Sequence, residues 1–269
     1  MIQSLKRAMS VLEYMAKQNR QEYSIAEISP AVKLPPSTVY RVLQTFLSGG
    51  YVLTDPKTHL YRLGPGLIAL ARAAGGKNDL AALAMPYLQR IAGETGDDAF
   101  LMVISGFQSH VVAKADGPNR IKIVSGFEAN SDLHCGANRK MLLAFQSDRF
   151  IEEYIGRGLK RYTSTTITNP QMLREELETI REEKTSFSLS EFIEGAMGVS
   201  APVFGRDGRI AASIGTSGPA FQVTSAKISH HKKVISECAA ELSALLGYEG
   251  GEPVRTPWRG SIETSQAES

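Results

Sequence analysis

Hydrophobic residues recur at the spacing of a helix in three short segments at the start of the chain. The first segment covers residues 4–15, and Ser24 and Ser37 stand as natural N-caps before the second and the third. Apolar positions three and four residues apart form one face in each segment, so the pattern predicts three amphipathic helices. These positions are Leu5, Ala8, Val11, Leu12 and Met15, then Ile25, Ile28 and Val32, then Val39, Val42, Leu43 and Phe46.

The links between these segments predict how the helices are joined, and the residues after the third helix predict a hairpin. Residues 33–36 read Lys-Leu-Pro-Pro and end the second helix, because the residue before a proline avoids the helical conformation. After the third helix, two strand-like runs at residues 51–54 and 60–63 flank the turn sequence Asp-Pro-Lys-Thr. Three helices and a small β-hairpin predict a winged helix-turn-helix, whose third helix enters the DNA major groove.

The third predicted helix carries polar side chains that can contact phosphates and base edges. An ordinary helical hairpin with a solvated polar face would show the same pattern, but the charge of the segment favours DNA binding. Residues 1–65 hold eight Lys/Arg and four Asp/Glu, a net charge of +4, which leaves 22 basic and 24 acidic residues, a net charge of −2, for the rest. A basic module is typical of nucleic-acid binding. The predicted DNA contacts are Lys33, Ser37, Thr38, Tyr40, Arg41, Gln44, Thr45 and Lys57.

Beyond the hairpin, the pattern predicts a connecting helix and then a domain of mixed helices and strands. A Gly-Pro-Gly break at residues 64–66 precedes a short Ala-rich helix at residues 67–74, and a longer helix comes next at residues 79–95. Turn signals separate the later elements, and the Asp-Gly pair at residues 207–208 is a strong hairpin signal. The remaining expected elements are strands at 99–104, 110–115, 121–124, 199–204 and 209–214, and helices at 137–146, 149–155, 170–183 and 225–246.

Composition and length bound the organisation of the chain. We expect a DNA-binding domain at 1–65, a linker helix at 66–78, a second domain at 79–248 and a disordered tail at 249–269. A length of 269 residues accommodates two domains, and a hydrophobic content of 42% is ordinary for a soluble protein. No apolar run is long enough to span a bilayer, and the two cysteines lie far apart in the sequence. These features predict a cytoplasmic protein with no membrane partner.

The second domain carries no sequence signature of an enzyme. A Gly-x-Ser-x-Gly elbow, a phosphate loop and a dinucleotide fingerprint are all absent from the sequence. Asp97 and Asp98 are adjacent, so their side chains would diverge on a strand. The His-Cys pair at 134–135 and the His-His pair at 230–231 lack the spacing of a zinc site. We therefore expect no catalytic residues, no metal and no other cofactor, while two alternatives stay open: an enzyme with an attached DNA-binding head, and a DNA-binding assembly protein without a small-molecule ligand.

The order of these motifs resembles that of the IclR family of bacterial transcriptional regulators, over about residues 1–248. The resemblance implies an α+β or α/β architecture, in which a winged helix-turn-helix and a linker helix precede a GAF-like sensor domain with a mixed or antiparallel sheet. It also implies a homodimer or dimer of dimers that binds a pseudo-palindromic operator in double-stranded DNA. Such regulators repress or activate genes, often of a neighbouring catabolic operon, in response to a small molecule. The matching stretches are residues 4–8, 34–45, 61–65, 84–88, 133–134, 140–144, 162–167, 191–195, 201–203 and 217–219.

The sensor departs from the family pattern where its ligand site is expected to begin. The family reads roughly Leu-His-Ala-Thr/Ser-Gly/Ala-x-Gly-Lys-Ala-Leu-Leu, where this chain has Leu-His-Cys-Gly-Ala-Asn-Arg-Lys-Met-Leu-Leu from residue 133. Members that bind small oxo-acids use backbone amides at the positions of Ala137 and Asn138, together with an Asp and a Cys that are here Ser188 and Gly198. Amides at a helix start suit a carboxylate, and the two exchanges remove a charge and some bulk.

The resemblance therefore implies a small organic acid as the effector, larger or differently polar than a two- or three-carbon oxo-acid, with aromatic acids among the candidates. Without the resemblance, the apolar members of the expected site would be core residues of an α/β domain, and the polar ones would be helix caps. The expected effector-binding residues are Ile123, Phe127, Leu133, Ala137, Asn138, Ser188 and Gly198.

Overall fold

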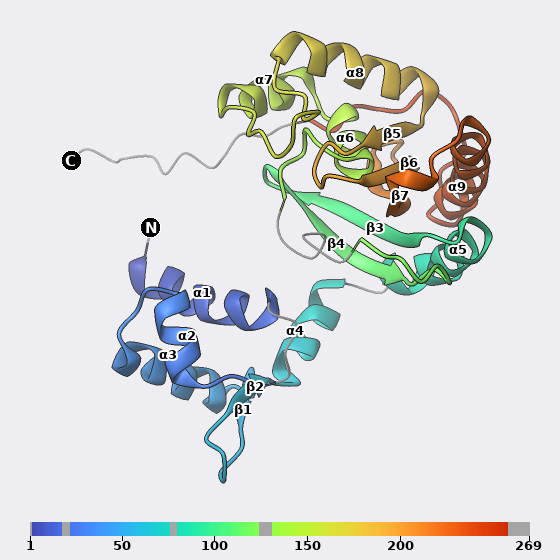
Figure 1. Ribbon diagram of the computed structural model, residues 1–269. Coiled ribbons are helices and arrows are strands. Elements are labelled where there is room, and N and C mark those ends of the chain that lie inside the picture. The colour runs from blue at the N-terminus through green and yellow to red at the C-terminus, as the bar shows by residue number, and fades with distance from the viewer. Residues whose placement is uncertain (1, 18–21, 76–79, 124–130, 258–269) are drawn as a thin grey trace. The chain divides into compact units, whose positions relative to one another are not determined.

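The computed structural model describes residues 2–17, 22–75, 80–123 and 131–257 (Figure 1). The chain divides into two compact units, Met1–Leu80 and Ala81–Ser269. Both units combine helices with antiparallel strands, which confirms the predicted α+β architecture. Among the described residues, no helix is both long enough and apolar enough to cross a membrane.

The first unit is a winged helix-turn-helix followed by one further helix (Figure 1). Three helices precede a two-stranded antiparallel hairpin, in which Val52 pairs with Leu63 and Thr54 pairs with Tyr61. This is the order that the hydrophobic pattern predicted. The elements are α1 (Gln3–Lys17), α2 (Ile25–Ala31), α3 (Pro36–Ser48), β1 (Val52–Thr54), β2 (Tyr61–Leu63) and α4 (Gly66–Gly75).

The core of the first unit forms where the helices meet the hairpin. The backbone of Tyr23 exchanges two hydrogen bonds of 2.8 Å with Tyr61 on β2, and its hydroxyl donates to the carbonyl of Met15 on α1 at 2.8 Å. One buried tyrosine thus ties the entry of α2 to both α1 and the wing. The buried hydrophobic residues around it are Val11, Met15, Ile28, Val39, Leu43, Val52 and Tyr61.

Serine N-caps were predicted for both α2 and α3, and the structure has the first but not the second. Ser24 caps α2 as expected, and a reciprocal bond from its own N–H to the Glu27 carboxylate completes a capping box. Ser37, however, caps nothing: α3 already begins at Pro36, and Pro35 occupies the N-cap position without a side-chain bond. Proline suits the first helical position because the helix needs no N–H there.

The second unit is built on a five-stranded antiparallel sheet with the order β4-β3-β7-β6-β5. The central strand, β7 (Ile210–Pro219), pairs with β3 on one side and with β6 on the other. The predicted turn at Asp207 and Gly208 joins β6 to β7, and Gly208 adopts a φ of +72° that suits glycine. The other strands are β3 (Asp98–Ser105), β4 (Gln108–Ala115), β5 (Ser186–Leu189) and β6 (Ala196–Phe204).

Helices α6 (Ala137–Ala144) and α9 (Ser225–Leu245) pack on β6 and β7 from opposite faces of the sheet. The hydroxyl of Thr216 on β7 lies 3.3 Å from Nδ1 of His231 on α9, whereas the next residue, Ser217, lines a cavity beside α6. Successive strand residues point to opposite faces, so the two helices enclose β7 between them. The further helices α5 (Leu80–Thr95), α7 (Asp148–Gly156) and α8 (Pro170–Glu183) complete the layers, with α8 packed on α6 (Figure 1).

Two segments of the second unit differ from the predicted elements. β5 was not predicted, because its sequence, Ser-Phe-Ser-Leu, is short and half polar; pairing with β6 holds it in place. The predicted strand at 121–124 is wrong for residues 121–123, which form no strand, and Val124 lies outside the described residues. Lys122 instead binds the carboxylate of Asp98 and donates to the carbonyl of Gly117 at 2.8 Å.

The described part of the expected tail, residues 249–257, packs against the second unit. The N–H of Val254 donates to the carbonyl of Gly208 at 2.9 Å, and the N–H of Thr256 donates to the carbonyl of Phe145 at 3.0 Å. The carbonyl of Thr256 in turn accepts from the N–H of Ser147 at 3.0 Å. The expected disorder therefore does not hold for these residues, because they join the β6–β7 turn to the link between α6 and α7. Residues 258–269 lie outside the described residues.

The capping box makes a prediction for the stability of α2. Replacing Ser24 with alanine removes the acceptor for the N–H of Glu27 and should cost about 1 kcal/mol, so the α2 amides should exchange hydrogen roughly fivefold faster in the full chain. Ser37→Ala is the matched control, because Ser37 is exposed and caps no helix. Hydrogen–deuterium exchange measures both variants. Equal exchange in Ser24→Ala and wild type would contradict the role of the cap.

Candidate DNA-binding surface and effector pocket

Helix α3 buries one side in the first unit and leaves the other exposed. Val39 and Leu43 are fully buried. At 100° per residue, the exposed side chains of Ser37, Arg41 and Gln44 lie on the side of the helix opposite to them. The structure thus places these three predicted DNA contacts at the centre of the exposed face, where a helix in the major groove presents its side chains to base edges.

The other predicted contacts on α3 flank this face. Tyr40, 49% exposed, lies on one flank, while half-buried Thr38 and exposed Thr45 lie on the other. Thr38, Arg41 and Thr45 also line a hollow between α3 and the first turns of α1. The hydroxyl of Thr45 donates to the carbonyl of Arg41 at 3.0 Å, so part of its hydrogen-bonding capacity is used within the helix.

The remaining two predicted DNA contacts are exposed lysines in turns. Lys33 ends the α2–α3 turn with a φ of +53°. Lys57 is part of the wing turn, where the carboxylate of Asp55 accepts hydrogen bonds from the N–H groups of Lys57 at 2.7 Å and Thr58 at 3.4 Å. These bonds lower the pKa of Asp55 and fix the backbone of the wing. Both lysine side chains are exposed, so phosphates of bound DNA could reach their ammonium groups.

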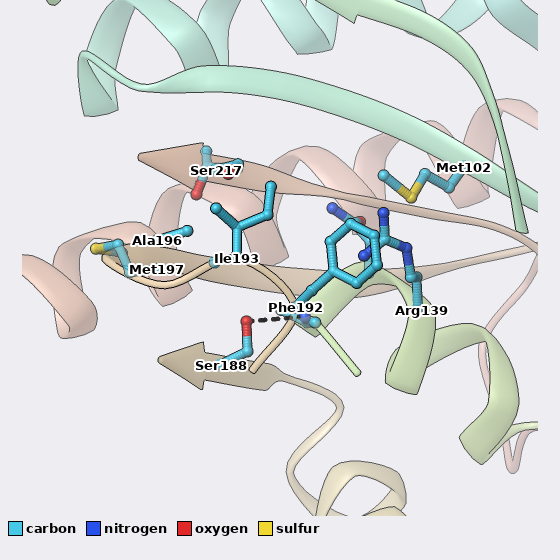
Figure 2. Close-up of a pocket in the computed structure, with 13 residues that line it drawn as sticks. Met102, Arg139, Ser188, Phe192, Ile193, Ala196, Met197 and Ser217 are labelled. Atoms are coloured by element: carbon cyan, nitrogen blue, oxygen red, sulfur yellow. Dashed lines mark hydrogen bonds between the residues drawn. The ribbon is translucent and has the colours of Figure 1, made fainter. Parts of the chain in front are cut away.

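A small cavity of about 30 Å³ lies beside the start of α6 in the second unit. Figure 2 shows its walls, which come from α6, from strands β3, β5, β6 and β7 and from the loop between β5 and β6. A volume of this size holds about two water molecules. The lining residues are Met102, Gly136, Ala137, Asn138, Arg139, Ser188, Phe192, Ile193, Ala196, Met197, Gly198, Thr216 and Ser217.

Four of the seven predicted effector-binding residues meet at this cavity. They are Ala137, Asn138, Ser188 and Gly198. Leu133 is fully buried in the hydrophobic core instead, and its N–H donates to the hydroxyl of Tyr154 at 2.8 Å. Ile123 is not among the lining residues, and Phe127 lies outside the described residues. The structure thus brings together the residues predicted at the start of α6 and on β5 and β6, whereas Leu133 and Ile123 lie elsewhere.

The first amides of α6 are largely used within the protein. Gly136, at a φ of +87°, donates its N–H to the carboxylate of Glu191 at 3.0 Å. The N–H of Ala137 donates to the hydroxyl of Ser188 at 3.0 Å (Figure 2). Gly198 also leaves no open space. A Cβ at this position would lie 3.2 Å from the hydroxyl oxygen of Ser188 and 3.4 Å from the Cβ of Ala137. Ser188 and Ala137 close the space that a larger residue would take.

Two residues that sequence reasoning missed occupy the cavity wall. The guanidinium of Arg139 lies 3.9 Å from the centre of the Phe192 ring, in the range of a cation–π contact (Figure 2). Arg139 is only 2% exposed, and burial lowers its pKa. The family pattern has a glycine at this position, and that exchange was the signal available in the sequence.

Two buried polar atoms at the cavity have no hydrogen-bond partner among the described residues. They are Oδ1 of Asn138 and Oγ of Ser217, in residues that are 4% and 5% exposed. Buried polar groups in native proteins are normally satisfied, so each unpaired atom requires an explanation. Both atoms line the cavity, where a bound polar molecule would reach them.

His134, one of the residues considered for zinc, uses both ring nitrogens in hydrogen bonds within the protein. Nδ1 of His134 accepts from the hydroxyl of Tyr154 at 2.6 Å, and Nε2 donates to the carbonyl of Lys160 at 2.8 Å. Burial lowers the pKa of His134 and raises that of the neighbouring Cys135 to about 12, so both stay neutral. Within the described ranges, no cluster of three or more His, Cys, Asp or Glu side chains could hold a metal ion.

Family models match both units of the chain. The IclR helix-turn-helix domain matches residues 4–56, and the model described as bacterial transcriptional regulator IclR C-terminal matches residues 73–244. The transcriptional repressor AllR of Salmonella typhi is 22% identical over 246 residues, which cover 91% of this chain and 90% of AllR. The transcriptional regulator BhcR of Paracoccus denitrificans is 29% identical over 243 residues, 90% of this chain and 86% of BhcR.

Solved structures show the same architecture. The IclR protein of Thermotoga maritima is 31% identical, with a TM-score of 0.73 and coverage of 91% of this chain and 99% of that one. An IclR homolog from Microbacterium hydrocarbonoxydans, in complex with 4-hydroxybenzoate, has a TM-score of 0.77 at 21% identity and covers 90% of this chain and 98% of its own. The second likeness concerns the fold alone. The family matches extend from the winged helix through the sensor domain, and the chain belongs to the IclR family of bacterial transcriptional regulators.

Proposed function

We propose that this IclR-type regulator binds a pseudo-palindromic operator through α3 and changes its DNA affinity when a small organic acid enters the cavity beside α6. The observation that carries the proposal is the cavity itself, whose buried polar atoms on Asn138 and Ser217 lack partners among the described residues. The 4-hydroxybenzoate complex of the Microbacterium homolog supports an acid, and aromatic acids in particular, as candidates. We further propose a cytoplasmic location, where operator DNA is found, and control of a catabolic operon.

Binding of an aromatic acid requires the cavity to open. A dry cavity that holds benzene measures about 150 Å³, whereas this one has about 30 Å³. The acid must therefore bind a conformation in which the wall has moved. A ligand shifts a protein only by the difference in its affinity for two conformations, and an opening pocket supplies such a difference.

A sensor accounts for the second unit better than an enzyme does. The thiol of Cys135 is buried and stays protonated. Both ring nitrogens of His134 are hydrogen-bonded, one to the hydroxyl of Tyr154 and the other to the carbonyl of Lys160. Catalysis needs a group within reach of a substrate, and neither residue lines the cavity. An assembly module without a ligand is the second candidate, and the small volume of the cavity favours it over an enzyme.

The first prediction concerns DNA affinity. Arg41→Ala removes a charged donor from the centre of the exposed face of α3 and should weaken operator binding by about 1–3 kcal/mol, if the side chain contacts a base pair. An operator selected from random DNA with wild-type protein provides the probe, and fluorescence anisotropy at fixed salt measures the affinity. Arg206→Ala, which removes an exposed charge from the second unit, is the control. Unchanged affinity in a folded Arg41→Ala protein would exclude this role for α3.

The second prediction concerns assembly. Leu5 and Met9 on α1 and Ile68 and Leu70 on α4 are between 46% and 61% exposed, and such apolar side chains favour pairing of two copies. Analytical ultracentrifugation should show a dimer or a dimer of dimers, and Ile68→Glu with Leu70→Glu should weaken operator binding by separating the heads. The control is Met172→Glu on α8, whose side chain is 58% exposed. A wild-type monomer that binds one half-site tightly would contradict the proposal.

The third prediction concerns the location of the effector site. Asn138→Trp places a large side chain in the cavity wall, so organic acids that stabilise the wild type should no longer raise its Tm. Thermal unfolding with a panel of aliphatic and aromatic carboxylates measures this, and titration calorimetry confirms each hit. Equal binding to wild type and Asn138→Trp would place the effector site elsewhere. The absence of any stabilising acid would favour the assembly module.

A further inference from the structure

We propose that residues 252–257 form a strap that holds the effector cavity closed and thereby raises the effector concentration to which the protein responds. The proposal rests on the proposed sensor function, because it concerns the same cavity. The strap lies beyond residue 244, where the match to the IclR C-terminal family model ends. It is therefore an addition to the sensor domain that the family shares.

The strap begins after the end of α9 and crosses the second unit to α7 (Figure 1). Before it, the ring of Tyr248 packs against that of Phe204 at the end of β6, with 5.1 Å between the ring centres. The hydroxyl of Tyr248 donates to the carbonyl of Gly251 at 2.8 Å. These contacts hold the residues that lead into the strap against the end of the sheet.

The first anchor of the strap is the turn between β6 and β7. The N–H of Val254 donates to the carbonyl of Gly208 at 2.9 Å. A Cβ added to Gly208 would lie 3.4 Å from Cγ2 of Val254, so the glycine allows the strap to approach closely. The two strands that meet at this turn also line the cavity near their other ends, at Gly198 and Ser217.

The second anchor is the end of α6, the helix that forms another wall of the cavity. The N–H of Thr256 donates to the carbonyl of Phe145, the C-cap residue of α6, at 3.0 Å. The carbonyl of Thr256 accepts from the N–H of Ser147, the N-cap residue of α7, at 3.0 Å. Arg255 adds an ion pair with the carboxylate of Asp148. The end of a helix leaves carbonyls without partners in the helix, and the strap provides a donor for one of them.

Helix α6 is thus bonded to its surroundings at both ends. At its start, Gly136 donates to the Glu191 carboxylate of the β5–β6 loop and Ala137 donates to the hydroxyl of Ser188 on β5. At its end, the strap connects it to the β6–β7 turn. The cavity between the helix and these strands has only about 30 Å³, so a ligand as large as benzene requires the walls to separate. Separation of α6 from β6 and β7 stretches or breaks the bonds of the strap.

The strap therefore adds to the free-energy cost of opening the cavity. When a ligand binds a conformation that is populated only in part, its apparent affinity falls in proportion to that population. Loss of one backbone hydrogen bond that favours the closed conformation raises the population of the open one about fivefold. The strap thus changes the response to an effector without contacting the effector.

The two cysteines of the chain report opening of the cavity without any ligand. Both thiols are buried, but Cys135 directly precedes the cavity residue Gly136, whereas Cys238 lies on α9. Burial raises the pKa of Cys135 to about 12, so its thiol reacts with iodoacetamide only when the structure around it opens. Mass spectrometry of the labelled peptides measures the rate at each cysteine in the same sample.

A variant that ends at Gly251 lacks the strap, and a variant that ends at Pro257 keeps it. The shorter variant should label Cys135 roughly five- to thirtyfold faster than wild type, with Cys238 unchanged. The variant that ends at Pro257 is the matched control and should label both cysteines at the wild-type rates. Thr256→Pro removes only one N–H donor, should lie between these two variants, and covers the case in which the shorter variant fails to fold.

Equal labelling of Cys135 in wild type and in the variant that ends at Gly251 would overturn the proposal. An equal rise at Cys135 and Cys238 would overturn it as well, because it would show a loss of stability throughout the second unit.

Thermal unfolding with benzoate and with hexanoate tests the regulatory consequence. An acid that stabilises the wild type should act on the variant that ends at Gly251 at roughly five- to thirtyfold lower concentration. An unchanged concentration, together with faster labelling of Cys135, would overturn the regulatory role of the strap and leave the sensor function intact. If neither acid stabilises wild type or variant, the sensor function loses its support, and the labelling rates alone decide whether the strap holds the cavity closed.

Discussion

The cavity depends on the buried ion pair between Lys140 and Glu191. Nζ of Lys140, a residue 1% exposed, lies 2.7 Å from the Glu191 carboxylate and 2.5 Å from that of Glu176. The same Glu191 carboxylate accepts the N–H of Gly136 at 3.0 Å, so it joins the β5–β6 loop to the start of α6. Removal of Lys140 would leave the largely buried Glu191 carboxylate without its cation, at a cost of about 3–5 kcal/mol. The pair therefore fixes the two elements whose separation defines the cavity.

A second buried charge, the carboxylate of Asp97, fixes the opposite face of the sheet. Its side chain is fully buried, 3.1 Å from the ammonium of Lys227 on α9, and it accepts from the amide of Asn119 at 3.0 Å. His231 lies 3.7 Å away, and burial lowers its pKa to about 4, so Lys227 supplies the compensating charge at neutral pH. The sequence pattern gave Asp97 no role beyond its place next to Asp98. In the structure it anchors the start of α9 to β3 and β7.

The sequence predicted elements wherever local chemistry decides the structure. The capping box at Ser24, the Asp207-Gly208 turn and the apolar stripes of α1–α3 all act over a few residues, and the structure has them where the pattern indicated. Long-range pairing decided the rest: β5 exists because β6 is beside it, and residues 249–257 are ordered because the carbonyls of Gly208 and Phe145 accept their N–H groups. In the candidate site, the structure brings the predicted residues Ala137 and Ser188 to one cavity, but the sequence could not show that they bond to each other, nor that Arg139 would stack on Phe192.

Strand β7 lines the cavity on one face of the sheet and contacts α9 on the other. The carbonyl of Thr216 lies in the cavity wall, 3.2 Å from where a Cβ on Gly198 would be, while its hydroxyl contacts His231 on α9. Two residues further, Gly218 packs against the Asp97 carboxylate so closely that no side chain fits. Close-packed interiors repack in discrete steps rather than deform continuously. Under the proposed sensor function, a ligand that pushes the wall at Gly198 and Thr216 would therefore also disturb the packing of β7 against α9 and Asp97, which is a direct physical route from the cavity to the far face of the sheet.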